Sequence, residues 1–146
     1  MSLEAWVQNA WLRRQPTSPN EIQQLLKIVD RDLSDSNAKG ISDDSRFAIA
    51  FNAALQSATM ALRASGYRTA GQGHHVRVVD SLPLTIGADA ALVQKLQALG
   101  RKRNTCFYDM AGAVSDTELK EMTALAVSLR DRVLEWLRKH HPELLK

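Results

Sequence analysis

The sequence predicts an all-α protein, a four-helix up-and-down bundle with additional short helices. Apolar residues recur at spacings of three and four through several long stretches, which is the period of an amphipathic helix. No segment alternates convincingly between apolar and polar residues, as a half-buried strand would. Alanine and leucine dominate the apolar residues, whereas aromatic residues make up only 5% of the chain. This balance favours packed helices over sheets.

The first half of the chain contains three predicted helices. The first covers about residues 2–14, with Ser2 as a candidate N-cap, and the prolines that follow end it. The second runs over about residues 19–33. The third begins after Ser42, ends before Gly66 and has the longest apolar stripe. Its members are Phe47, Phe51, Ala54, Leu55, Ala58, Met60, Ala61 and Leu62.

The second half begins with a glycine-rich segment, GYRTAGQGHH, which is typical of a loop. A short helix is expected over about residues 73–82, where Pro83 ends it, and a longer one over about 88–103. The last helix is expected over about 116–139. Acidic residues at its start and basic residues at its end complement the helix dipole.

Length and composition indicate one domain covering residues 1–146. A domain of this size needs no disulfide or metal to fold. The only cysteine, Cys106, excludes an internal disulfide and favours a reducing compartment, so we expect a cytoplasmic protein in which Cys106 is buried. No apolar run approaches the roughly 20 residues that span a bilayer, and the first residues do not resemble a signal peptide. The net charge of +3 permits a nucleic-acid partner without requiring one.

The segment RKRNTCFYD, residues 101–109, contains the strongest candidates for a functional site. Arg103 continues the apolar stripe of the helix over 88–103, so its guanidinium is expected at the end of the bundle or in a cleft, where it needs a partner. Spacing alone favours a structural interpretation, in which Arg101, Lys102 and Arg103 complement the negative end of the helix dipole. The alternative is that Arg103 holds a phosphate through charged hydrogen bonds.

Three segments in this order resemble the HEPN superfamily of small helical-bundle proteins. They are SRFAIAFNAALQSATMALRASGYR, then GQGHH, and then Arg103-Asn104 followed by an aromatic residue and an acid. The resemblance covers about residues 42–139. Many members are toxin–antitoxin ribonucleases or accessory domains of nucleotidyltransferases. It therefore implies RNA or a nucleotide as ligand, an antitoxin or a nucleotidyltransferase as protein partner, a homodimer, and no cofactor or metal.

The catalytic signature of that superfamily is an arginine, often followed by a polar residue, and a histidine after four to six intervening positions. Arg103 and Asn104 match its beginning, but the position of the histidine is occupied by Tyr108. Tyrosine has a reference pKa of about 10, so at neutral pH it is a poor base. We therefore expect a non-catalytic or weakly active module in which Arg103, Asn104 and Tyr108 form the site. The alternative is a metal-independent toxin ribonuclease that acts as a dimer.

The segment RTAGQGHH contains a second arginine–histidine spacing, because His74 and His75 follow Arg68 after five and six intervening residues. Such a loose pattern arises easily by chance, so a structural interpretation is favoured, in which glycines shape a turn and His74 caps or packs against the next helix. These histidines could nevertheless face the same cleft as Arg103. The additional binding candidates are Arg101, Lys102, Arg68, His74 and His75.

Overall fold

The computed structural model describes residues 1–146, and most of the chain is helical, as predicted. In chain order the elements are α1 (Leu3–Gln8), β1 (Leu12–Arg14), α2 (Pro19–Asp35), α3 (Asp43–Ala64), β2 (Tyr67–Thr69), α4 (His74–Asp80), α5 (Leu82–Thr85), α6 (Ala90–Asn104), the π-helix η1 (Thr105–Asp109), α7 (Asp116–His140) and the 3₁₀-helix η2 (Pro142–Leu145). The expectation of no strands is wrong. β1 and β2 form a two-stranded antiparallel sheet in which Leu12 pairs with Thr69.

The single helix predicted over residues 2–14 is also wrong, because the chain changes direction in its middle. α1 ends at Gln8, and Ala10 adopts a φ of 62°, in the left-handed region. The chain then continues into β1. The apolar spacing of three and four nevertheless persists, because Trp6 is buried and the Trp11 ring meets it edge-on with centroids 5.6 Å apart. Trp6 and Trp11 thus have helical spacing in the sequence because both pack against the same core, although a turn separates them.

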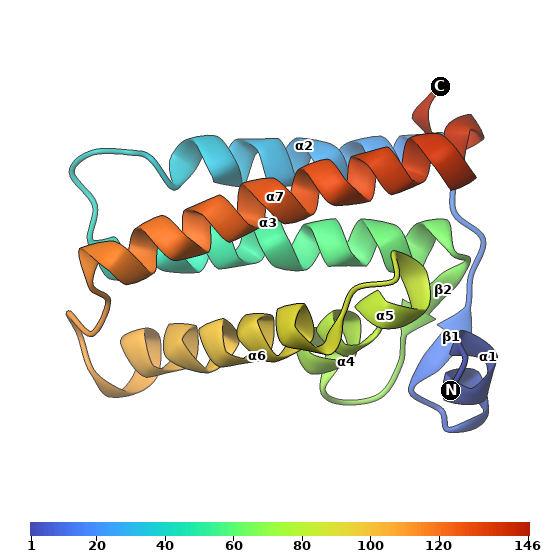
Figure 1. The fold of residues 1–146 in the computed structure, drawn as a ribbon, viewed down its shortest axis with the longest axis horizontal. Helices are drawn as coiled ribbons and strands as arrows, with labels where there is room; N and C mark the ends of the chain where they lie inside the picture. The colour runs from blue at the N-terminus through green and yellow to red at the C-terminus, as the bar shows by residue number, and fades with distance from the viewer.

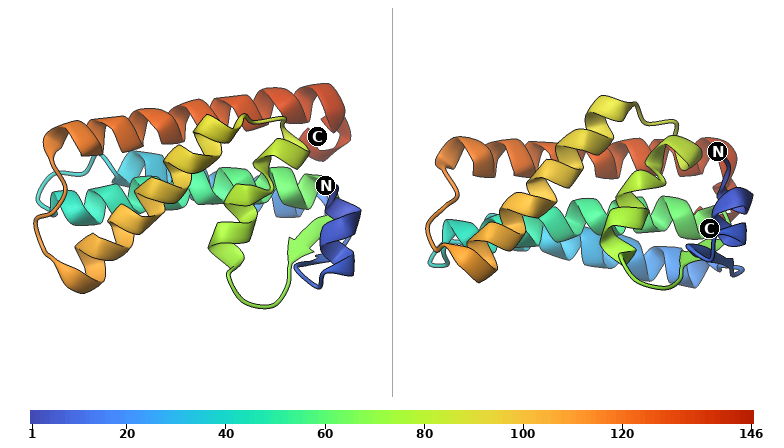
Figure 2. Two further views of the ribbon diagram at one scale, coloured as in Figure 1. Left: turned by 60° about the horizontal axis from the view of Figure 1, so that its bottom comes forward. Right: turned by 90° about the horizontal axis from the view of Figure 1, so that it is seen from below.

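Three long helices, α2, α3 and α7, lie side by side with nearly parallel axes (Figures 1 and 2). α3 lies between the other two and packs along both of them. Its many small residues allow this close approach from two sides. The alanines of α3 that are at most 1% exposed are Ala50, Ala53, Ala54, Ala58 and Ala61.

Capping residues set the boundaries of the long helices close to the predicted ones. The hydroxyl of Ser42 accepts a hydrogen bond from the backbone N–H of Ser45, at 3.1 Å, and starts α3. Ser115 and Glu118 form a reciprocal capping box at the start of α7. These bonds are local in sequence, which is why the boundaries could be predicted without knowledge of the packing.

The helix α6 runs obliquely across α3 and α7, and α4 and α5 lead the chain to its start (Figure 2). Pro83 does not simply end the short helix, because it lies at the start of α5. Ion pairs between Lys95 and Glu121 and between Lys102 and Glu118 connect α6 to α7. Gln97, in the middle of α6, bonds to Val76 and Asp80 of α4, and the basic end of α6 lies beside the start of α7.

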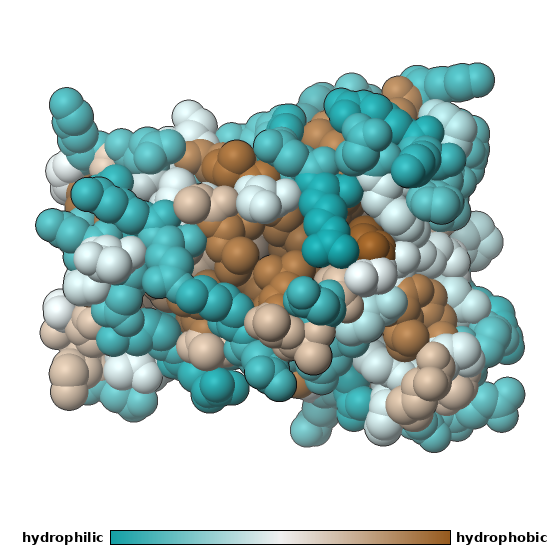
Figure 3. All heavy atoms as spheres, viewed as in Figure 1, coloured by the Kyte–Doolittle hydropathy of each residue, from teal (hydrophilic) through white to brown (hydrophobic).

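The surface is mostly polar around a central apolar region on the face seen in Figure 3. None of the helices is both long enough and apolar enough to cross a membrane.

Candidate functional site

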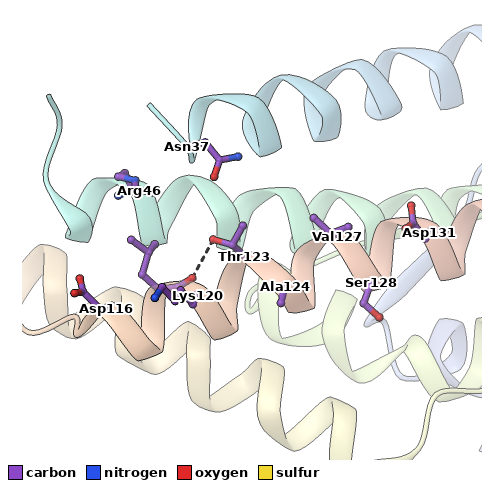
Figure 4. A pocket seen from close by; sticks show the side chains of 10 residues that line it. Asn37, Arg46, Asp116, Lys120, Thr123, Ala124, Val127, Ser128 and Asp131 are labelled. Carbon is purple, nitrogen blue, oxygen red and sulfur yellow. Dashed lines mark hydrogen bonds between the residues drawn. The ribbon is translucent and has the colours of Figure 1, made fainter. Parts of the chain in front are cut away.

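The largest cavity, about 880 Å³, lies along α7 beside α3 and the end of α2 (Figure 4). It contains none of the site residues expected from the sequence. Its arginine, Arg46, is already occupied: Arg46 Nε donates to the carbonyl oxygen of Ser36 at 2.8 Å, and its Nη1 lies 3.4 Å from a carboxylate oxygen of Asp43. Arg46 is therefore not free to bind an anionic ligand, and we look elsewhere for the site.

A second cavity, of about 370 Å³, lies between α3, α4 and α6. It brings together four of the predicted site residues, although His75 is far in sequence from the other three. Its lining consists of Phe51, His75, Val76, Asp80, Gln97, Gly100, Arg101, Arg103 and Asn104. We call it the Arg103 cavity.

Arg103 is the most unusual side chain of this cavity. Its Nε is buried and has no hydrogen-bond partner, and Arg103 takes part in none of the ion pairs of the protein. The guanidinium carbon lies over the ring of Phe51, 5.1 Å from the centroid. A buried donor without a partner is costly, so this geometry leaves Arg103 able to gain by binding an acceptor.

Gly100 explains how Arg103 reaches that ring. A Cβ placed on Gly100 would lie 3.1 Å from Cζ of Phe51, tighter than an ordinary contact. The glycine therefore lets α6 approach α3 closely at this point. Arg103 follows Gly100 by three residues, which places it on the same side of α6, above the ring.

His75 enters the cavity from the first turn of α4. The pKa of His75 lies below its usual value, because partial burial disfavours the charged ring and because Arg103 and His74 add positive charge nearby. The imidazole is therefore neutral at pH 7 and can accept a proton. This resolves a choice that the sequence left open, since His75 does face the same cavity as Arg103.

An acid and an amide complete the wall between α4 and α6. The side-chain amide of Gln97 donates to Asp80 Oδ1 at 2.8 Å and to the backbone carbonyl oxygen of Val76 at 3.1 Å. With Arg101 and Arg103 both lining the cavity, Asp80 compensates only part of their charge. The lining therefore remains positive even while His75 is neutral.

The other predicted site residues lie outside this cavity. Tyr108 is 79% exposed and neither lines the cavity nor packs into the core. Lys102 pairs with Glu118 on α7 at 3.2 Å. Arg68 lies on β2 opposite Arg13.

His74 also lies outside, with its Nδ1 2.7 Å from Oγ1 of Thr69. It lines a smaller neighbouring cavity of about 140 Å³, which His75 also borders. The N-cap of α4 is Gly73, so His74 packs beside β2 rather than capping the helix.

Cys106 is buried in η1, as predicted from the sequence. Burial is the main cause that raises the pKa of its thiol, and the negative charge of Asp44 adds to it. The thiol is therefore protonated at neutral pH and a poor nucleophile. No cluster of three histidine, cysteine or acidic side chains is arranged to hold a metal ion.

Two important members of the site, Phe51 and Gly100, were not among the candidates from the sequence. Phe51 belongs to the apolar stripe of α3, and nothing in that stripe distinguishes it from its buried neighbours. Gly100 lies within a helical period, where an isolated glycine is unfavourable and thus indicates a close approach. That signal was available in the sequence but did not identify the contacting ring.

The chain matches no family model, no curated protein and no solved structure. The likeness to the HEPN superfamily therefore rests on the three sequence segments, and the site rests on its geometry.

Proposed function

We propose that this protein is a helical binding module that holds a phosphate of RNA or of a nucleotide in the Arg103 cavity. The observation that carries the proposal is the buried, unpartnered Nε of Arg103 in a positively lined cavity. A guanidinium presents donors in a planar fork that matches two phosphate oxygens. Arg101 and Asn104 line the same cavity and supply further donors.

The proposal includes a HEPN-like architecture, an up-and-down bundle of α2, α3, α6 and α7 that acts as a homodimer. It also places the protein in a toxin–antitoxin or nucleotidyltransferase-associated system, with the antitoxin or the nucleotidyltransferase as partner. The Arg103-Asn104 pair at the end of α6, beside the longest apolar stripe, supports this assignment. The position of Tyr108 outside the cavity supports binding rather than catalysis, because no base stands at the expected place of the motif.

The experiment compares binding of a short fluorescent RNA by the wild type and by Arg103→Ala. We expect roughly a tenfold or larger loss of affinity, since a hydrogen bond to a charged group contributes about 1.5–3 kcal/mol. Arg138→Ala is the matched control, because Arg138 is exposed and pairs only with Glu135 on its own helix. Equal affinities of wild type and Arg103→Ala would contradict the proposal.

A second candidate function, a metal-independent ribonuclease, is favoured by one observation: neutral His75 shares the cavity with Arg103. In this function His75 takes the proton of a ribose 2′-hydroxyl, whose oxygen attacks the adjacent phosphorus. A 2′,3′-cyclic phosphate forms, and the bond to the 5′-oxygen breaks, that oxygen taking a proton from water. Arg103 would stabilise the negative charge on the phosphoryl oxygens.

Cleavage of labelled RNA in the presence of EDTA tests this candidate. We expect the wild type to cleave and His75→Ala to lose cleavage while retaining RNA binding. If the wild type binds RNA without cutting it, the ribonuclease function is excluded and the function as a binding module stands. Cleavage that survives in both His75→Ala and Arg103→Ala would assign the activity to a contaminant.

A further inference from the structure

Phe107, Tyr108 and Met110 form an exposed apolar patch at η1, which we call the η1 patch. They are 50%, 79% and 62% exposed, whereas Cys106 in the same turn is buried. The two aromatic rings meet edge to face, with centroids 6.5 Å apart and an interplanar angle of 86°. One face of Tyr108 is therefore available to a flat ligand, and Phe107 supports its edge.

The η1 patch follows the Arg103 cavity directly in the chain. Asn104 is the last residue of α6 and Tyr108 lies four residues further on, in η1, so about one helical turn separates the two residues. Asn104 lines the cavity. The helix closes with a π-turn, in which the backbone N–H of Met110 donates to the carbonyl oxygen of Thr105 at 2.8 Å. Such turns are frequent at functional sites.

We propose that Tyr108, supported by Phe107, is a stacking surface for a base of single-stranded RNA whose neighbouring phosphate occupies the Arg103 cavity. This inference rests on the function proposed above and specifies its ligand as a strand rather than a free phosphate. Exposed aromatic rings beside a positively charged groove are the combination with which proteins bind single strands. In a duplex the bases are already stacked on one another and cannot reach Tyr108.

The charge around the η1 patch favours a polyanion over a second copy of the chain. Residues 101–109 contain three cations and one acid, Asp109, and because Lys102 pairs with Glu118, Arg101 and Arg103 are the cations left to a ligand. In a two-fold contact the same surface faces itself, so the cations beside the patch would approach one another. An RNA strand instead brings negative charge to them and a flat apolar surface to the tyrosine ring.

The test uses fluorescence anisotropy with a labelled oligouridine about six nucleotides long. The control ligand is an abasic oligonucleotide of the same length, which keeps the phosphates and lacks the bases. We expect Tyr108→Ala to bind the oligouridine roughly five- to a hundredfold more weakly, and to bind the abasic strand like the wild type. Tyr108→Phe keeps the ring and should retain the affinity.

Arg103→Ala separates this inference from the proposed function. If Arg103→Ala weakens binding of both strands while Tyr108→Ala weakens neither, the stacking surface is wrong and the phosphate site stands. If Arg103→Ala weakens neither strand, the proposed function and the inference both fail. An oligothymidine DNA of the same length that binds as tightly as the RNA would refute the restriction to RNA.

Analytical ultracentrifugation of the same variants tests whether a second copy of the chain covers the η1 patch instead. If Tyr108→Ala dissociates a dimer and leaves oligouridine binding unchanged, the patch is an interface between copies, and the inference is overturned. Tyr108 is largely exposed in the structure, so its variants should retain the wild-type circular dichroism spectrum.

Discussion

The Arg103 guanidinium lies above the Phe51 ring, 5.1 Å from its centroid, and thereby joins the end of α6 to the middle of α3. An aromatic face stabilises a guanidinium without occupying the N–H groups of the guanidinium. These N–H groups point outward in the guanidinium plane. An ion pair at the same place would occupy those groups. The ring therefore positions the cation and leaves its donors to a ligand.

Phe51→Leu should weaken ligand binding more than it disturbs the fold. The substitution keeps an apolar side chain of similar size in the core, at a cost of about 1–2 kcal/mol in unfolding free energy. It removes the ring beneath Arg103, so affinity for the RNA should fall about threefold or more. Titration calorimetry and urea unfolding measure the two effects. An unchanged affinity would show that the ring does not position the cation.

Gly100→Ala should reduce both stability and affinity. The added methyl group would crowd Phe51, at a cost of about 1–3 kcal/mol, and this is partly offset by a gain of about 1 kcal/mol in helix propensity. We expect a net loss of up to about 2 kcal/mol in unfolding free energy. Ala98 lies at an exposed position of the same helix, so Ala98→Gly measures the effect of helix propensity on unfolding free energy without a packing effect. If Gly100→Ala gains as much unfolding free energy as Ala98→Gly loses, the added methyl group does not crowd Phe51.

Binding of the abasic strand should strengthen as the pH falls below about 6.5. The pKa of His75 is lowered in the free protein, and a bound phosphodiester raises it again, so binding takes up a proton. The other charged or titratable groups that line this cavity or the neighbouring one are Arg101, Arg103, Asp80 and His74. His75→Gln should flatten the pH dependence of Kd. The same slope in the variant would assign the proton to another group.

Without ligand, lowering the pH should weaken the fold, whereas it strengthens binding of the abasic strand. Because the folded-state pKa of His75 lies below the unfolded value of 6.5, the unfolded chain binds the proton more readily. Unfolding free energy should therefore fall as the pH decreases from 6.5 through the lowered pKa. Thermal melts of wild type and His75→Gln across this range measure the contribution. A variant that loses stability just as steeply would exclude His75 as its cause.

Ser115→Ala should destabilise the protein and leave the site unaffected. It removes the capping bond to the backbone N–H of Glu118, at a cost of about 0.5–2 kcal/mol. The pKa of Glu118 is lowered chiefly by the backbone N–H of Ser115, so this carboxylate stabilises the fold above its usual pKa of 4.5 and loses that contribution as the pH falls. Urea unfolding and RNA titration together check that only stability changes.

The sequence could predict the long helices because their determinants are local. Ser42 and Ser115 cap helices through bonds that span three residues, and the apolar period extends over each helix. The first segment shows the limit of this approach. Trp6 and Trp11 have helical spacing, but the pairing of β1 with β2, more than 50 residues away, requires the chain to turn at Ala10.

The sequence by itself determined the helical class, the main helix boundaries and the candidate status of Arg103, because each depends on near neighbours and on the period of burial. Only the tertiary structure decided which candidates share a cavity. The close approach at Gly100 places Arg103 over Phe51, and the packing of α4 on α6 brings His75 to it. Tyr108, four residues from Asn104, is directed to solvent by the turn that buries Cys106. Contacts between residues far apart in the chain set these directions, and no local pattern encodes them.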